Sequence, residues 1–341
     1  MDFEPLRAAA GLRVTPEAQH YQAATAGPAD EADRDARAWN RLALVPRVLR
    51  GLTDVDTGTT LLGQRFDTPV IVSATAGHQL CHPDAEFASG AGAARAGALY
   101  IYSSSAGTEV GDFGRRMTGP WWVQVYLMRD AARSDAYLDR AVAAGAGAVV
   151  FNVDNPGTLG EAPFRSVQAD SGLAAANYPD WTWPRMSAQL EPNLTLAHIA
   201  DIAKRTGLPV VVKGVLHPAD AAAVIEAGAA AVMVSNHGRR QLAGVIPTAD
   251  ALPAVTAAVA GRIPVLVDGG IRSGIDVLRA LALGATAVGV GRPILWGLAA
   301  AGADGVTEVL STLTAELRQA MAGVTAASLA DLTPDLLRSR R

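Results

Sequence analysis

The chain has 341 residues, half of them hydrophobic, and its 29 Lys and Arg against 33 Asp and Glu give a formal net charge of −4. This composition excludes a disordered or fibrous protein. The slightly acidic balance, without a basic cluster, argues against nucleic acid or a membrane surface as a partner. Cys81 is the only cysteine, which excludes an internal disulfide and a cysteine-based metal site. With no signal-like start and no long apolar stretch, we expect a cytoplasmic protein.

Eight short apolar runs have the composition of buried strands. They begin, in chain order, at Pro69, Ala98, Pro120, Ala148, Pro209, Ala230, Pro264 and Ala287. Each run is mostly β-branched or aromatic, which is typical of parallel strands covered on both faces. Segments of helical spacing lie between them, for example at 84–95, 131–144, 217–227, 248–259 and 273–283. Strands that alternate with helices in this way predict an α/β fold, the (β/α)8 TIM barrel.

We expect a single barrel domain over residues 1–341, with three additions. These are an N-terminal extension (1–64), a long lid loop after strand 4 (155–192) and C-terminal helices (302–341). The loop is rich in Gly, Pro, Asn and Trp, and long irregular loops on the carboxyl face of a barrel are more often lids than linkers. A disordered insertion is the alternative for this loop.

Polar side chains of the strand regions gather at the carboxyl ends of the strands, where barrel active sites are built. They are Thr75, Ser103, Gln124, Tyr126, Asn152, Asp154, Lys213, Ser235, His237, Asp268 and Arg292. A barrel that served only as a scaffold would have no reason to collect them there. We therefore expect one functional site at this end.

The loops after the last two strands predict a phosphate site. Asp-Gly-Gly-Ile-Arg at 268–272 follows the seventh run, and Gly291 and Arg292 follow the eighth. Glycine lets backbone N–H groups approach a phosphate, and arginine adds charge-assisted hydrogen bonds. Tight turns also favour glycine, but two such loops with two arginines favour a phosphate, carried by a cofactor or by a substrate.

Lys213 and His237 are the candidates for chemistry. Only two of the 29 basic residues are lysines, and one of them, Lys213, ends a buried strand. This placement indicates a need for a compact charge. The alternative is a strand-end lysine that only extends its charge to solvent. His237 ends another strand, and Asp154 is expected to orient its imidazole as a general base, against the alternative of a core histidine. No two histidines have metal-ligand spacing, so we expect no metal.

These motifs resemble those of the FMN-dependent 2-hydroxy acid oxidase/dehydrogenase family, which includes glycolate, lactate and hydroxymandelate oxidases. The likeness runs from about Tyr21 to Leu329. Its strongest segments are VVKG (211–214), SNHGRRQL (235–242), VDGGIRSG (267–274) and GRP (291–293), supported by SATA (73–76), QVY (124–126) and VDNP (153–156). The resemblance implies FMN as cofactor, a small-molecule substrate, O2 or another electron acceptor, and a homotetramer.

The resemblance also implies a role for each site residue. The FMN-binding set is Ala74, Thr75, Ala76, Ser103, Gln124, Asn152, Lys213, Ser235, Asp268, Gly269, Gly270, Arg272, Gly291 and Arg292. Within it, Lys213 would face the ring edge where negative charge develops. The ribityl phosphate would be held by Asp268, Gly270, Arg272, Gly291 and Arg292. The catalytic set is His237, Asp154, Tyr126, Tyr21 and Arg240. His237, supported by Asp154, would take a proton, Arg240 would clamp the substrate carboxylate, and the tyrosines would bind its carboxylate or hydroxyl.

The chain departs from the family pattern on the substrate side. Family members usually carry a second clamp arginine where this chain has Glu161 and Ala162, and Arg165 lies about three residues late. Gln22 replaces an aromatic residue after Tyr21. Because the flavin motifs are kept and the substrate motifs are altered, the sequence points to a larger or chemically different substrate.

We therefore expect oxidation of the α C–H bond of a 2-hydroxy acid, aryl or larger and mandelate-like, to the 2-oxo acid, with His237 as the base. Ala76 beside the flavin leans toward reoxidation by O2. One alternative is the same flavin chemistry on an amine or another specialised metabolite. Others are an FMN-dependent isomerase of a phosphorylated substrate and a flavin-binding barrel without activity.

Overall fold

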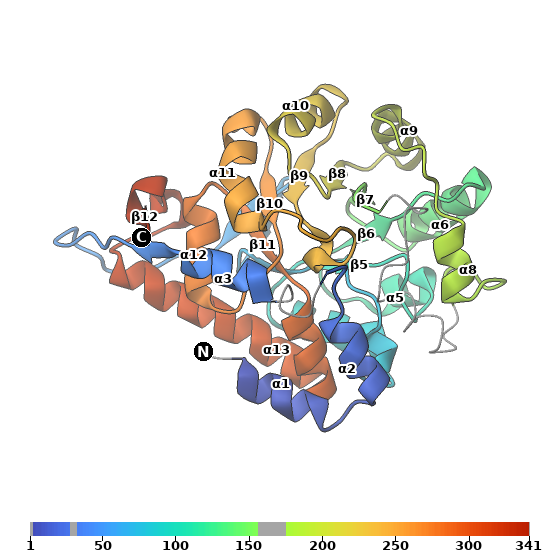
Figure 1. The fold of residues 1–341 in the computed structure, drawn as a ribbon, viewed down its shortest axis with the longest axis horizontal. Coiled ribbons are helices and arrows are strands. Elements are labelled where there is room, and N and C mark those ends of the chain that lie inside the picture. The colour runs from blue at the N-terminus through green and yellow to red at the C-terminus, as the bar shows by residue number, and fades with distance from the viewer. Residues whose placement is uncertain (1–2, 28–32, 156–174, 341) are drawn as a thin grey trace.

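A closed barrel of eight parallel strands forms the centre of the molecule (Figure 1). The computed structural model describes residues 3–27, 33–155 and 175–340. The barrel strands are β4 (Val70–Val72), β5 (Tyr100–Tyr102), β6 (Trp121–Val125), β7 (Val149–Asn152), β8 (Val210–Lys213), β9 (Ala231–Val234), β10 (Val265–Val267) and β11 (Ala287–Val290). Strand β11 pairs with β4 and closes the barrel. The predicted TIM barrel is confirmed, with one strand in each apolar run.

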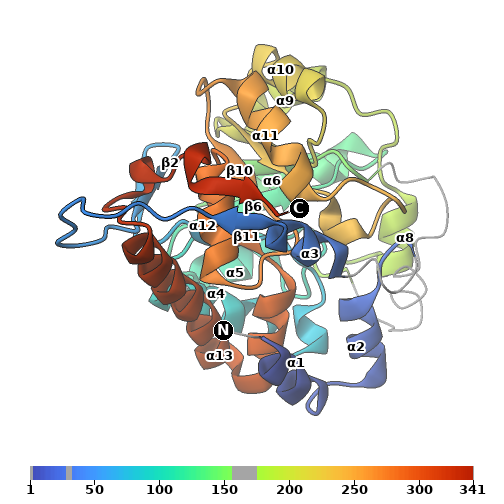
Figure 2. The same ribbon diagram turned by 60° about the vertical axis from the view of Figure 1, so that its left-hand side comes forward.

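Helices surround the barrel (Figures 1 and 2). They are α4 (Ala85–Arg95), α5 (Val110–Arg116), α6 (Ala131–Ala143), α9 (Ala197–Thr206), α10 (Pro218–Glu226), α11 (Thr248–Val259), α12 (Gly274–Ala282) and α13 (Arg292–Gly323). Helix α12 shows how local sequence sets the ends of a helix. The hydroxyl of Ser273 accepts a hydrogen bond from the Asp276 N–H (3.2 Å) at its start. Gly284, whose φ is 96°, turns the chain after its end.

The barrel interior is a packed core, which leaves the functional site to one end of the barrel. Ile71, Trp122 and Met233 belong to the interior cluster, together with Leu61 and Phe66. The last two come from a hairpin of β2 (Thr59–Leu61) and β3 (Gln64–Phe66). The Thr59 hydroxyl donates to the carbonyl of Thr286 (3.1 Å), the residue before β11, so this hairpin covers the amino end of the barrel. The carboxyl ends of the strands remain for a site.

The two chain ends pack together on the outside of the barrel. The N-terminal elements are α1 (Glu4–Gly11), α2 (Pro16–Ala23), α3 (Arg34–Asn40) and β1 (Leu42–Leu44). After α13 come the short 3-10 helices η4 (Leu329–Asp331) and η5 (Pro334–Leu336) and the strand β12 (Leu337–Ser339). Strand β12 pairs antiparallel with β1, as the blue and red strands of Figure 2 show. The C-terminal segment, expected to be helical, thus ends in a strand, because its partner lies at the other end of the chain.

Among the described residues, no helix is long and apolar enough to cross a membrane. In the same part of the chain, no three His, Cys, Asp or Glu side chains are grouped so that they could hold a metal ion.

Candidate active site

A cavity that opens to solvent lies at the carboxyl ends of the barrel strands, with about 1100 Å³ of empty space including the solvent at its mouth. The expected site residues that line it are Tyr21, Ala74, Thr75, Ala76, Ser103, Tyr126, Lys213, His237, Arg240, Asp268, Gly269, Gly270, Arg272, Gly291 and Arg292. Three of the other four, Gln124, Asp154 and Ser235, stand behind this lining and contact it, and the fourth, Asn152, donates to Asp154. The structure therefore brings together the side chains that the strand-end argument selected.

Lys213 is a buried cation in the wall of the cavity, only 3% exposed. Its Nζ donates to the hydroxyl of Ser235 (2.8 Å) and lies 3.6 Å from Asp268 Oδ2. The Ser73 hydroxyl donates to the same carboxylate oxygen (3.1 Å). Because these partners come from the ends of neighbouring strands, the charge is held rigidly. A fixed cation of this kind stabilises negative charge that develops beside it.

The far end of the cavity is built to hold an anion. Burial, with the nearby charges of Arg240 and Arg272, lowers the pKa of Arg292, so a negatively charged group would be stabilised there. Gly291 precedes Arg292 at the start of α13, and the positive end of the helix dipole at this start would also favour an anion. Gly270 has a φ of 79°, and a Cβ on it would lie 2.4 Å from the backbone of Asp35. This position therefore requires glycine.

His237 stands between a carboxylate and a phenol. Its Nδ1 lies 3.0 Å from Asp154 Oδ1, and its Nε2 lies 3.3 Å from the Tyr126 hydroxyl. Burial alone would raise the pKa of Asp154, but the charges of His237 and Lys213 and two side-chain hydrogen bonds hold it below its usual value. An ionised carboxylate at Nδ1 keeps the proton on that nitrogen. Nε2 is then the basic nitrogen, and it faces the side on which Tyr126 lines the cavity.

A strained turn carries His237 into the cavity. The φ angles of His237, Gly238 and Arg239 are 57°, 62° and 64°, a left-handed stretch that L-residues seldom adopt. Asp35 from α3 holds this turn. It accepts two hydrogen bonds from Asn236 Nδ2 (both 2.9 Å) and pairs with the buried Arg239 (3.4 Å). Sequence reasoning missed Asp35, because it acts across the chain and no local motif marks it.

Helix α2 supports the expected carboxylate clamp. The Arg240 guanidinium lies 4.7 Å above the Tyr21 ring and donates to the carbonyls of Tyr21 (2.6 Å) and Gln22 (3.2 Å). The Gln22 carbonyl also accepts from Arg292 Nε (3.0 Å), so it connects Arg240, the expected clamp residue, to Arg292 at the expected phosphate site. Gln22 Nε2 donates to Cys81 Sγ (3.3 Å), which gives a role to the residue that replaces an aromatic side chain. Arg165 lies outside the described residues.

The cavity also has a wall that the sequence analysis did not identify. Met186, Ser187 and Leu190 line it, and the first two belong to the helix α8 (Trp183–Ala188), inside the segment expected to be a lid loop. The usable signal was the spacing of Trp183, Met186 and Leu190, which is helical, after Pro184 at the start of the helix.

The residues present fit a flavin nucleotide. Gln124 is buried behind Ser103, and its Oε1 accepts from the Ser104 N–H (3.1 Å). Its Nε2 has no hydrogen-bond partner within the described residues, so it can donate to a ring carbonyl. The buried Lys213 and the anion end match a redox ring that becomes negative and a terminal phosphate. The fold and the site thus define a flavin-nucleotide oxidoreductase of the TIM-barrel class.

Comparison with known proteins makes this assignment specific. Residues 10–339 match the sequence model of the family described as FMN-dependent dehydrogenase. The chain is 36% identical over 337 residues to an L-lactate oxidase of Nostoc sp., covering 93% of this chain and 92% of that protein. It is 38% identical over 310 residues to a 4-hydroxymandelate oxidase of Amycolatopsis orientalis, covering 83% of each. A crystal structure of a mandelate oxidase is similar to this chain, with a TM-score of 0.87 and 37% sequence identity. The match covers 99% of this chain and 97% of the mandelate oxidase chain.

The chain therefore belongs to the FMN-dependent dehydrogenase family, and it is an FMN-dependent enzyme that oxidises 2-hydroxy acids.

Proposed function

We propose that this enzyme oxidises 2-hydroxy acids with an aryl or comparably large side chain to the 2-oxo acids, and that O2 takes the electrons. The observation that carries the proposal is the line of Asp154, His237 and Tyr126 beside a cavity that Met186 and Leu190 make apolar on one side. The names of the hydroxymandelate and mandelate oxidase relatives support an aryl substrate.

In this proposal His237 is the general base. Nε2 takes a proton from the substrate hydroxyl or its α-carbon, and the Asp154 carboxylate, 3.0 Å from Nδ1, stabilises the imidazolium that results. Bound FMN supplies the acceptor for the two electrons of the C–H bond. Burial raises the pKa of Tyr126 well above its usual value, so its hydroxyl stays protonated and donates to a substrate oxygen.

Arg240 and Tyr21 bind the substrate carboxylate in this scheme. The carbonyls of helix α2 hold the guanidinium in place before substrate arrives, which reduces the entropy lost on binding. For the second half of the clamp we propose Arg165, outside the described residues. Its replacement by Ala is expected to raise KM for small 2-hydroxy acids by about tenfold, because one charge-assisted hydrogen bond is worth about 1.5–3 kcal/mol.

The cofactor residues are assigned by the same proposal. Ala74, Thr75, Ala76, Ser103, Gln124 and Asn152 would line the flavin ring. Lys213, fixed by Ser235, would face its electron-accepting edge. Gly270, Arg272, Gly291 and Arg292 would hold the ribityl phosphate. Asp268, expected at the phosphate as well, would instead hold Lys213, because its Oδ2 lies 3.6 Å from Lys213 Nζ and a carboxylate repels a phosphate. The assembly we propose is a homotetramer, which sedimentation of the purified protein would test.

An anaerobic absorbance titration tests the substrate class. The FMN-loaded enzyme is titrated with (S)-mandelate and with L-lactate, and the bleached sample is then exposed to air. We expect both acids to bleach the flavin, kcat/KM for mandelate to exceed that for lactate by about tenfold, and the yellow colour to return as O2 is consumed. A flavin that lactate bleaches and mandelate does not would overturn the aryl assignment.

A further inference from the structure

Residues 175–191 contribute Met186, Ser187 and Leu190 to the lining of the active-site cavity. Met186 and Leu190 are 2% and 3% exposed, and both line the cavity that Tyr21, Tyr126 and His237 also line. Trp183, at the start of α8, is buried, and its ring lies 5.9 Å from that of Tyr21. The helix therefore packs directly on a residue of the substrate side. We call residues 175–191 the α8 wall.

The end of the α8 wall is fastened to the loop after β6, which carries Tyr126. The Arg129 N–H donates to the carbonyl of Gln189 (2.8 Å), and the Glu191 N–H donates to the carbonyl of Leu127 (2.8 Å). Between these bonds, Leu190 pairs with Met128 as an isolated β-bridge. The distance from the wall to Tyr126 is thus set by backbone hydrogen bonds, which a change of side chain in the wall does not remove.

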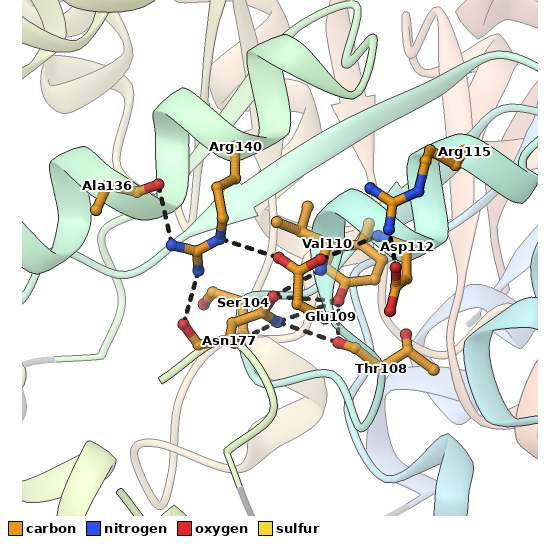
Figure 3. A network of polar contacts seen from close by, with 10 residues as sticks. Ser104, Thr108, Glu109, Val110, Asp112, Arg115, Ala136, Arg140 and Asn177 are labelled. Atoms are coloured by element: carbon orange, nitrogen blue, oxygen red, sulfur yellow. Dashed lines mark hydrogen bonds and ion pairs between the residues drawn. The ribbon is translucent and has the colours of Figure 1, made fainter. Parts of the chain in front are cut away.

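The start of the α8 wall depends on one buried side chain, Asn177 (Figure 3). Its Oδ1 accepts from the Val110 N–H (2.9 Å). Its Nδ2 donates to the Tyr102 hydroxyl (3.1 Å) and to the carbonyl of Ser104 (3.3 Å). Tyr102 ends strand β5, and Ser104 follows Ser103, which lines the cavity on the flavin side. Asn177 therefore joins the wall to the flavin side of the site.

A second contact holds the backbone of Asn177 from outside. Arg140 on α6 donates to the Asn177 carbonyl (2.8 Å) and to Glu109 Oε1 (2.9 Å), as the dashed lines of Figure 3 show. Glu109 in turn caps α5, because its Oε2 accepts from the Asp112 N–H (3.0 Å). A short loop completes the anchor, and it is closed by a hydrogen bond from the Ala175 N–H to the carbonyl of Trp181 (3.1 Å). The wall is thus held at both ends, and its middle faces the cavity.

We propose that Met186 determines which size of 2-hydroxy acid side chain the enzyme accepts, and that Asn177 is the positioning residue that holds Met186 at its distance from the flavin side. The proposal rests on the 2-hydroxy acid activity and not on the aryl preference. Methionine is unbranched and adapts to irregular gaps, so it limits the room for a substrate side chain without a rigid fit. A shorter residue enlarges this room, and an aromatic residue fills it.

The first test compares Met186→Ala with Met186→Phe on a graded series of glycolate, lactate, 2-hydroxyoctanoate and mandelate. For Met186→Ala we expect the ratio of kcat/KM for 2-hydroxyoctanoate to that for lactate to rise by about fivefold to tenfold. For Met186→Phe we expect kcat/KM for mandelate to fall by about tenfold, while glycolate is little affected. Variants that changed all four substrates by the same factor would overturn the role of Met186.

The second test uses Asn177→Asp, which keeps the shape of the side chain and cannot donate to Tyr102 or Ser104. We expect KM for mandelate to rise by about tenfold with kcat kept within threefold, so that the size preference flattens. Arg115→Gln is the matched control, because Arg115 forms an exposed pair with Asp112 in the same network (Figure 3). A purely structural role would lower the melting temperature and leave the substrate ratio unchanged, which would overturn the proposal.

If Asn177→Asp does not fold, Arg140→Gln carries the same expectation, because it removes the bond to the Asn177 carbonyl and leaves Asn177 itself intact. The outcomes also separate the two proposals. A wild-type enzyme that prefers short acids, with Met186 variants that still shift the size profile, would overturn the aryl assignment and support this inference.

Discussion

The two sides of the cavity are built by different means. The flavin side consists of strand ends, where Lys213, Ser235 and Asp268 sit on neighbouring strands of one closed ladder. The substrate side consists of α2, the turn at 237–239 and the α8 wall, which side-chain hydrogen bonds and ring contacts hold. If the proposed assignment of the two sides is right, the barrel fixes the first side whatever the substrate is. The selectivity of the second side should then be able to change without disturbing the cofactor.

The largest expected effect separates chemistry from cofactor binding. His237→Ala should lower kcat by about 10²–10⁴-fold, the usual contribution of a general base. The variant should still bind FMN, because His237 is not among the residues assigned to the cofactor. Stopped-flow reduction and the visible spectrum measure the two properties on the same sample. A variant that lost FMN would show that the two sides are not independent.

The anion end can be tested by removing the phosphate from the cofactor. Riboflavin should bind about 10²-fold or more weakly than FMN, because each charge-assisted bond to an arginine contributes about 1.5–3 kcal/mol. Arg272→Met should reduce the difference in affinity between FMN and riboflavin. Arg41→Met, at an exposed arginine that pairs with Asp250, is the control. Fluorescence quenching gives both affinities. Equal binding of riboflavin and FMN would contradict a phosphate site at Arg272 and Arg292.

A smaller effect concerns the carboxylate behind the base. Burial alone would raise the pKa of Asp154, but the charges of His237 and Lys213 hold it below its usual value, so the carboxylate stays ionised over the working range. Asp154→Asn removes the negative charge that would stabilise the imidazolium formed when His237 takes the proton, and kcat/KM should fall by about tenfold. Steady-state kinetics of the FMN-loaded variant and the wild type measure this loss. An unchanged kcat/KM would indicate that Asp154 only positions the ring.

The smallest expected effect concerns Gln22. Gln22→Ala removes the bond to Cys81 but keeps the carbonyl that Arg240 and Arg292 share. One neutral hydrogen bond contributes about 1 kcal/mol, so KM for substrate should rise by about fivefold or less. Cys81→Ala breaks the same contact from its other side and should give the same change. A large loss of FMN in either variant would show that the Gln22 side chain supports the anion end as well.

Sequence reasoning worked best where local pattern and tertiary position coincide. A run of β-branched residues after a proline predicts a buried strand, and the polar residue at its end then lies at the carboxyl face of the barrel. This is why Lys213 and Asp268 could be placed together before any contact was known. The same reasoning predicted that Asp154 and His237, which follow different strands, lie together. In the structure, Asp154 Oδ1 lies 3.0 Å from His237 Nδ1.

The sequence by itself determined the barrel, the face on which the site was expected, and the family whose cofactor is FMN. Each of these depends on short segments whose periodicity or residue types can be recognised without knowledge of the fold. Only the tertiary structure decided the strand β12, the support of His237 by Asp35, and the approach of Met186 to the cavity. Each of these requires a partner far away in the chain. Their placement depends on the net free energy of packing, which no local pattern records.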